Sequence, residues 1–347
     1  MHIATSVKLL SAAATLALLA GCSSGSAIAP ASSTAQSHYV HAMNGRIPIA
    51  LNPVGMLKLR QLSIQNHKAS FNTCPAAGPI VYFSDFNDSV IDIFKVPFAG
   101  QAPCGQFTGL INPQGMIVRR HVLYVANTGA GTVVAFHRGA TSPFKTYTDP
   151  NCSGQFPLDV TVSLDGYIYA TNIFGGSCNG SISSWKKDGT FIGNIPNQAG
   201  ANSYYLTIQK DGTLYYDDNT FALYKASCSA GTCGSFSNTG AVFNFPGGLR
   251  SADDEDVVLD DQSAPGGGSL TTYEPPNFTS GDTCSVGGSD PVTFDINHKQ
   301  HHAFIADAGL NEGIELTYPS CALIGTVPGN SAGLPIGMAK DFPETLK

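Results

Sequence analysis

One short pattern recurs six times along this 347-residue chain, and it constrains the fold more than any other feature. A run of strand-forming residues ends in Asp or Asn, a short turn follows, and a second apolar run comes next, as in HVLYVANTGAGTVVAF (121–136). Strand formers on both sides of a Gly-containing turn predict a β-hairpin. The first strands end at anchor residues 42, 45, 46, 43 and 46 positions apart, namely Asp85, Asn127, Asn172, Asp218, Asp261 and Asp307. This regular spacing indicates copies of one structural unit.

Six copies at a period in the forties predict an all-β protein, a six-bladed β-propeller with four-stranded blades. A further strand precedes the hairpins, as in NPQGMIV (112–118) and FPLDVTV (156–162), and ALIGTVPG (322–329) is typical of an outer strand. The segment LPIGMAKDF (334–342) matches NPQGMIV but has no hairpin after it. We therefore expect this C-terminal strand to complete the first blade and close the ring, so that no sheet edge is left open.

The beginning of the chain has the features of an export signal. Lys8 precedes a short apolar stretch (9–19), and Leu19-Ala20-Gly21-Cys22 follows it. This arrangement resembles the lipobox of bacterial lipoproteins, which implies cleavage before Cys22 and acylation of that cysteine, palmitate included. We expect a signal peptide (1–21), acylated Cys22 with a flexible Ser/Ala-rich tether (22–37), an N-terminal extension (38–73) and the propeller (74–347). Ser23 favours the outer membrane if the cell is Gram-negative.

Composition supports an exported chain of short strands and many turns. Charged residues make up 12% of the chain, about half of the usual ~25%, and 38 residues are glycine. No long window has a 3.6-residue apolar period, so helices should be few. The net charge of −7 and the absence of a basic stripe exclude nucleic acid as a partner.

Eight cysteines remain after Cys22, and an even number in an exported chain indicates disulfides. Cys228 and Cys233 flank a Gly-containing turn that brings them together, and we pair Cys152 with Cys178 as a second candidate. Eight cysteines allow 105 connectivities, so the sequence does not fix the others. A structural zinc site is the alternative, but no CxxC occurs.

The pattern P-x-G-apolar, LYVAN, G, VxxF resembles the NHL repeat and, more broadly, the six-bladed gluconolactonase/regucalcin-like propellers, over residues 75–347. The resemblance implies a ligand face, formed by the loops leading into the innermost strands and by the turns after the anchors. Lactonase-like enzymes of this fold hold a divalent metal in the channel with a Glu and Asn or Asp side chains. Here the matching positions hold Gly115, Asp159, Gly248 and Gly337, so Asp159 is the one plausible metal ligand among them, with the anchor Asp218 as the second candidate.

Candidate contact residues on the ligand face are the six anchors, Asp85, Asn127, Asn172, Asp218, Asp261 and Asp307, and two aromatic residues that follow anchors, Phe174 and Phe221. The alternative for each anchor is a structural role, because Asp and Asn at a strand end accept hydrogen bonds from nearby backbone N–H groups. His298, His301 and His302 fall between two strands of the sixth blade, on the opposite face, where a polar turn is the simplest interpretation. No GxSxG occurs, and no catalytic residue is assigned.

These observations favour a cell-envelope lipoprotein that acts as a binding or scaffolding propeller for a protein, peptide or glycan, attached to the membrane through its lipid. The alternative is a metal-dependent hydrolase of the lactonase type, so whether the chain is an enzyme stays open. No cofactor is assigned apart from this alternative metal. Several carboxylates or amides converging in the channel would favour the enzyme. A channel lined by Val118, Val162, Ile208 and Phe294 would favour the scaffold.

Overall fold

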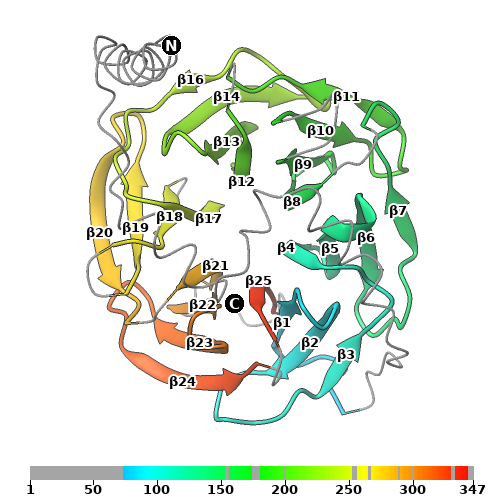
Figure 1. Ribbon diagram of the computed structural model, residues 1–347, viewed down its shortest axis with the longest axis vertical. Coiled ribbons are helices and arrows are strands. Elements are labelled where there is room, and N and C mark those ends of the chain that lie inside the picture. The colour runs from blue at the N-terminus through cyan, green and yellow to red at the C-terminus, as the bar shows by residue number, and fades with distance from the viewer. Residues whose placement is uncertain are drawn as a thin grey trace, which may run out of the picture.

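The computed structural model describes residues 73–152, 156–173, 180–198, 201–251, 256–264, 267–287, 290–297, 301–329 and 333–342. Within these ranges the chain forms six antiparallel sheets arranged as blades around a central axis (Figure 1). The predicted all-β, six-bladed propeller is therefore confirmed. These ranges contain one 3-10 turn, η2 (Thr128–Ala130), and no helix that is long and apolar enough to cross a membrane.

The signal peptide (1–21), Cys22 with its tether (22–37) and residues 38–72 of the predicted extension lie outside the described ranges. Their roles stay predictions. The same holds for Phe174, Cys178 and His298.

Each blade follows one strand order from the axis outward. The innermost strands of blades 1 to 6 are β25 (Pro335–Asp341), β4 (Pro113–Arg119), β8 (Pro157–Val162), β12 (Ser203–Ile208), β17 (Pro246–Ser251) and β21 (Pro291–Asn297). The second strands, which end at the anchors, are β1 (Ile80–Asp85), β5 (Val122–Asn127), β9 (Ile168–Asn172), β13 (Thr213–Asp218), β18 (Val257–Asp261) and β22 (His302–Asp307).

The third strands are β2 (Val90–Lys95), β6 (Thr132–His137), β10 (Ile182–Trp185), β14 (Leu223–Ser229), β19 (Ser269–Glu274) and β23 (Glu312–Thr317). The outer strands are β3 (Gly105–Phe107), β7 (Lys145–Tyr147), β11 (Phe191–Ile195), β15 (Thr232–Cys233) with β16 (Ser237–Asn238), β20 (Thr279–Ser285) and β24 (Leu323–Pro328). Five of these sheets have one outer strand. Blade 4 has two, because β15 and β16 both pair with β14.

The C-terminal strand closes the ring as predicted. β25 pairs antiparallel with β1, and Tyr82 lies opposite Ala339 (Figure 1). The last residue of β25, Asp341, is held by blade 2: Arg138 Nη1 lies 2.9 Å and His121 Nδ1 2.6 Å from its carboxylate oxygens. Pairing satisfies the backbone groups of an otherwise open edge, and the ion pair ties the closing strand to the neighbouring blade.

Apolar side chains fill the spaces between blades, because both faces of each sheet pack against a neighbour. All six residues of β1 are buried. A strand that is buried on both faces has apolar residues at successive positions, so the second strands do not alternate between apolar and polar residues. Trp185 of blade 3 is fully buried against Tyr147 of blade 2, and its indole N–H donates to the carbonyl of Thr148 at 3.0 Å. The aromatic residues of the third strands thus contribute to packing between blades.

Disulfides reinforce the loops and outer edges. The predicted Cys228–Cys233 bond is present at the tip of a hairpin in blade 4. Two further bonds were not indicated by the sequence: Cys74–Cys104 within blade 1, and Cys284–Cys321 between blades 5 and 6. The proposed Cys152–Cys178 pair involves a residue outside the described ranges and stays a prediction.

Candidate functional site

The six innermost strands approach one another closely around the channel. Each has a register shift against its second strand near its beginning, for example between Pro113 and Met116 in β4. Such bulges bend the strand and change the direction of a side chain. Gly115 lies where a Cβ atom would be 2.1 Å from Asp159 Oδ1, and a Cβ on Gly337 would be 2.0 Å from the carbonyl oxygen of Gln114. Glycine at these positions therefore reflects the close approach of neighbouring blades.

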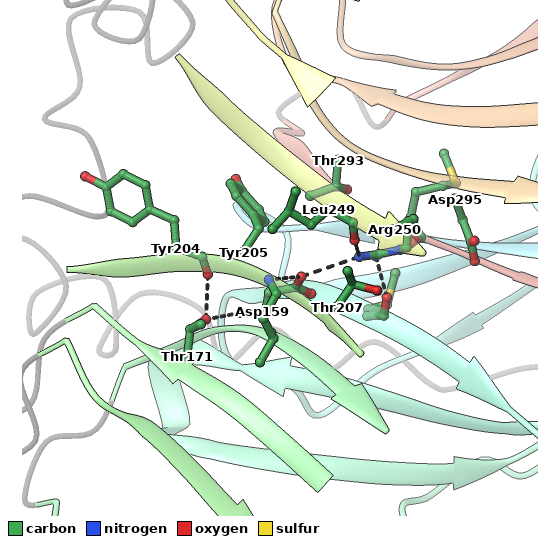
Figure 2. Close-up of polar contacts among 12 residues, drawn as sticks. Asp159, Thr171, Tyr204, Tyr205, Thr207, Leu249, Arg250, Thr293 and Asp295 are labelled. Carbon is green, nitrogen blue, oxygen red and sulfur yellow. Dashed lines mark hydrogen bonds and ion pairs between the residues drawn. The ribbon is translucent and has the colours of Figure 1, made fainter. Parts of the chain in front are cut away.

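Arg250 reaches from β17 across the channel to three other blades (Figure 2). Its Nη1 lies 3.4 Å from Asp159 Oδ2 in blade 3. Its Nη2 donates to the carbonyl of Met116 in blade 2 at 2.8 Å and, more weakly, to that of Met338 in blade 1 at 3.5 Å. Both charged side chains are buried. One guanidinium thus joins four blades at the centre of the ring.

Asp159, the stronger of the two metal candidates, is engaged by this ion pair. Its Oδ2 also accepts a hydrogen bond from the backbone N–H of Leu206 at 3.3 Å. Burial raises the pKa of Asp159, and the positive charge of Arg250 opposes that rise.

Asp218, the second metal candidate, caps its own turn. Its Oδ1 accepts hydrogen bonds from the backbone N–H and hydroxyl of Thr220 at 2.9 and 2.6 Å, and burial raises its pKa. In the part of the chain that the structure describes, no three His, Cys, Asp or Glu side chains are arranged to hold a metal ion. The observed donor set does not fit the divalent metal that the resemblance implies.

The residue before the anchor is polar in four of the six blades, whereas blades 2 and 6 have Ala126 and Ala306 at this position. Ser84 accepts a hydrogen bond from the N–H of Gly337 at 2.7 Å and donates to the carbonyl of Gln114 in the next blade at 3.0 Å. Thr171 does the same in blade 3: it accepts from Asp159 N–H and donates to the Tyr204 carbonyl at 2.5 Å (Figure 2). These hydroxyls join adjacent blades by acting as donor and acceptor at once.

Asp217 and Asp260 occupy this same position in blades 4 and 5. Asp217 Oδ1 accepts from the N–H of Tyr205 at 2.8 Å, as Thr171 accepts from Asp159. Asp217 Oδ2 and both carboxyl oxygens of Asp260 are buried without a hydrogen-bond partner among the described residues. Burial raises the pKa of both side chains well above the usual value, with nearby acids adding to the rise. A carboxyl group that keeps its proton has the donor that Ser84 and Thr171 supply.

Four of the six anchors hold the chain that leads into their own innermost strand. Asp85 accepts from Leu334 N–H at 3.1 Å and Asn127 from Ile111 N–H at 2.7 Å. Asp261 accepts from Phe245 N–H at 3.0 Å. In blade 6, Asp307 accepts from the N–H of Asp290 at 3.2 Å and from that of Leu310, in its own turn, at 2.8 Å.

The other two anchors bond differently. In blade 4, Asn219 accepts from the N–H of Asn202 at 2.8 Å, while its neighbour Asp218 bonds the turn. In blade 3, Asn172 donates to the hydroxyl of Ser183 at 2.7 Å. All six anchor side chains are buried and engaged within the fold, which agrees with the structural alternative for these residues.

The loop face carries an apolar cluster over the end of the channel, which we call the loop-face apolar cluster. Its members follow the anchors or lie at the beginning of the innermost strands: Phe86, Phe156, Leu158, Ile173, Tyr204, Phe243, Val292, Ala308, Leu334 and Ile336. Phe221 is half-buried and packs on this cluster, with its ring 5.4 Å from that of Phe245. Val242 and Leu310 stand beside it with 85% and 50% of their surface exposed.

The four apolar residues that would have favoured the scaffold as a channel lining lie elsewhere. Val118, Val162, Ile208 and Phe294 pack in the cores between blades instead. The reason is that side chains of an innermost strand point at the two neighbouring blades, while its backbone borders the channel. The channel holds polar side chains, of which Arg250, Asp217 and Asp260 were not identified from the sequence. The doubled acids in LYYDD and VVLDD, and the lone Arg in FPGGLR, were the available signals.

Comparison with known proteins supports the fold and leaves the family open. No protein-family model and no curated protein matches the chain. A chain of a nidogen/laminin complex is similar in structure, with 14% identity, a TM-score of 0.60 and coverage of 76% of this chain and 98% of that one.

Two further solved structures overlap less well. A Bacteroides caccae protein of unknown function has a TM-score of 0.45 at 14% identity, covering 62% of this chain and 73% of that one. The WD40 propeller domain of Doa1 has a TM-score of 0.48 at 12% identity, covering 65% and 71%.

The pairing of Arg250 with Asp159 is testable by a double-mutant cycle. We expect Arg250→Met to lower the free energy of unfolding by about 3–5 kcal/mol, because it leaves a buried carboxylate without its counter-ion. Asp159→Asn in the Arg250→Met background should recover part of that loss. Lys340→Met is the control, since its ion pair with Asp295 is partly exposed and should contribute about 1 kcal/mol or less. Urea denaturation of the parent, Arg250→Met, Asp159→Asn, the double variant and the control gives the comparison; additive effects of the two single substitutions would contradict the coupling.

Asp290 should make stability depend on pH. Its burial beside Asp307 raises its pKa to about 7, whereas the unfolded chain has the ordinary value near 4. The folded state therefore binds the proton more tightly, and stability should fall as pH rises from about 4 to 7, with a slope of up to ~1.4 kcal/mol per pH unit. Asp290→Asn should flatten this part of the profile and be more stable than the parent at pH 8. Asp282→Asn, at an exposed position, serves as control, and an unchanged slope in Asp290→Asn would refute the assignment.

Proposed function

We propose that this chain is a lipid-anchored protein of the cell envelope whose propeller binds another envelope protein through its loop face. The proposed attachment to the membrane through a lipid rests on the sequence Leu19-Ala20-Gly21-Cys22 and the Ser/Ala-rich stretch after it. The binding part rests on the loop-face apolar cluster and the exposed Val242 and Leu310 beside it.

The loop face has the surface composition that suits a protein partner. Leu158, Tyr204, Val292 and Ile336 are each between 3% and 9% exposed, so the cluster lies just beneath the surface. An apolar centre with a polar rim is the common arrangement of protein interfaces. Exposed Asn219, Thr220 and Asn244 supply polar groups on the same face. A peptide or glycan would leave this apolar area less completely covered than a folded partner.

The similar chain from the nidogen/laminin complex agrees with such a role, because the structure is of an assembly of two different proteins. The hydrolase alternative draws no support from the channel. Asp159 is paired with Arg250, Asp218 bonds its own turn, and burial raises the pKa of Asp217 and Asp260. The binding role is therefore the better account of the described side chains.

The lipid anchor is tested by one substitution. Cells expressing the full chain are labelled with an alkyne analogue of palmitate, and the protein is then isolated and the label detected. We expect label on the parent chain and none on Cys22→Ala, which should also leave the membrane fraction. Ser23→Ala is the matched control and should keep both label and location. Label that persists in Cys22→Ala would place the acyl group elsewhere.

The binding face is tested by photo-cross-linking in intact cells. A photoreactive amino acid is introduced at position 310 or 242 on the loop face, or at position 164 on the opposite face. Leu164 is a matched control because it is 42% exposed, close to the 50% of Leu310. We expect one cross-linked species of defined mass from positions 310 and 242 and none from 164. Equal cross-linking from both faces, or none from the loop face, would contradict the proposal.

A further inference from the structure

Blade 4 departs from the other five in the way its outer edge is built. The third strand β14 is seven residues long, and two short strands share its outer side. The beginning of β14 pairs with β16, with Lys225 opposite Ser237, while its end pairs with β15 within the Cys228–Cys233 hairpin. The disulfide holds the hairpin that contains β15. Because β15 and β16 are separate strands, the outer side of β14 is not covered by one continuous strand.

A cavity of about 470 Å³ opens beside this divided edge, between blades 4 and 5. Blade 4 contributes Gln209, Tyr215 and Lys225, and blade 5 contributes Asp256 and Pro275. These residues lie near the Asp211-Gly212 turn that joins β12 to β13, so the cavity is on the face opposite to the loop face. Its volume is within the range of small-molecule sites in proteins.

The floor of the cavity is polar and its groups are held in place. Tyr215 is buried, and its hydroxyl donates to Gln209 Oε1 at 3.2 Å. The ammonium of Lys225 lies 4.6 Å from the centre of the Phe278 ring, a cation–π arrangement that fixes its position. A hydroxyl, an amide and an ammonium are thus presented together by two buried or half-buried strands. Such pre-positioned groups bind a ligand with less loss of side-chain freedom.

The rim adds hydroxyls and acids. Ser227, Ser235 and Ser237 are exposed hydroxyl-bearing residues on the blade 4 side. Asp211 and Asp256 also line the cavity, and Asp211 already accepts hydrogen bonds from Thr213 at 2.7 and 2.9 Å. Two carboxylates against one ammonium disfavour an anionic ligand. Among the described lining residues, donors and acceptors outnumber the apolar Ala226 and two prolines, which disfavours an apolar ligand.

We propose that this cavity is a binding site for a neutral saccharide of one or two hexose units. A hexose offers hydroxyl groups that each donate and accept, which matches the mixture of hydroxyl, amide, carboxylate and ammonium groups around the cavity. Pro275 and Pro276 line the cavity and supply apolar atoms for contact with the C–H groups of the sugar. The site is on the face opposite to that of the proposed protein partner, so the two proposals stand or fall separately.

The test compares hexoses of the same size and different charge. Saturation-transfer NMR with the purified chain uses glucose, N-acetylglucosamine and, as an anionic relative, glucuronate. We expect saturation transfer to the two neutral sugars and at least about tenfold weaker binding of glucuronate. Ser237→Trp fills the cavity from an exposed position and should abolish the transfer. Ser280→Trp, at an exposed position on β20, is the control and should leave it unchanged.

Three outcomes would overturn the proposal. No transfer to either neutral sugar at millimolar concentration excludes the ligand class. If glucuronate binds as tightly as the neutral sugars, the argument from charge is wrong. Transfer that survives in Ser237→Trp shows that the sugar binds elsewhere. A circular-dichroism spectrum and melting curve of each variant confirm that the loss of transfer does not come from unfolding.

Discussion

A hydrogen bond at the end of the second strand, present in four of the six blades, is the interaction on which the rest of this propeller depends. An Asp or Asn oxygen accepts the N–H of the chain that leads into the innermost strand, as Asp85 does with Leu334 and Asn127 with Ile111. In these blades the contact fixes where the innermost strand begins. A buried acceptor satisfied in this way stabilises the fold and has little capacity left for a ligand. In blade 4 the neighbouring Asn219 makes the equivalent contact, and in blade 3 Asn172 bonds Ser183 instead.

The channel follows from that placement. Six strands brought close around one axis leave room for few side chains, and Gly115 and Gly337 mark where even a Cβ would collide. The acids that face inward lose their hydration, which raises their pKa values. Arg250 balances the charge of Asp159, whereas Asp217 and Asp260 stand where hydroxyls stand in other blades. The centre of the ring is thus a stabilising network that joins blades.

The fold was predictable because its determinants are local and repeated. Strand runs, anchors and the unmatched segment 334–342 are each visible within a few residues, and the number of copies gives the number of blades. The Arg250–Asp159 pair was not predictable in the same way, because its members are 91 residues apart and come from blades that are not neighbours. Comparing the fifth residue of each innermost strand would have singled out Arg250 among Ile117, Thr161, Thr207, Asp295 and Ala339. The Cys284–Cys321 bond likewise depends on the packing of two blades.

The places where this chain departs from its own repeat are the places where function is best sought. The regular elements, such as anchors, bulges and cores between blades, are explained by the needs of the ring. Among the described residues, the departures that our proposals use are the exposed apolar side chains of Val242 and Leu310 on the loop face and the divided outer edge of blade 4. Neither contributes to closing the ring or to burying a core. A rigid ring with a different surface at each end is suited to holding two unlike ligands at a fixed separation.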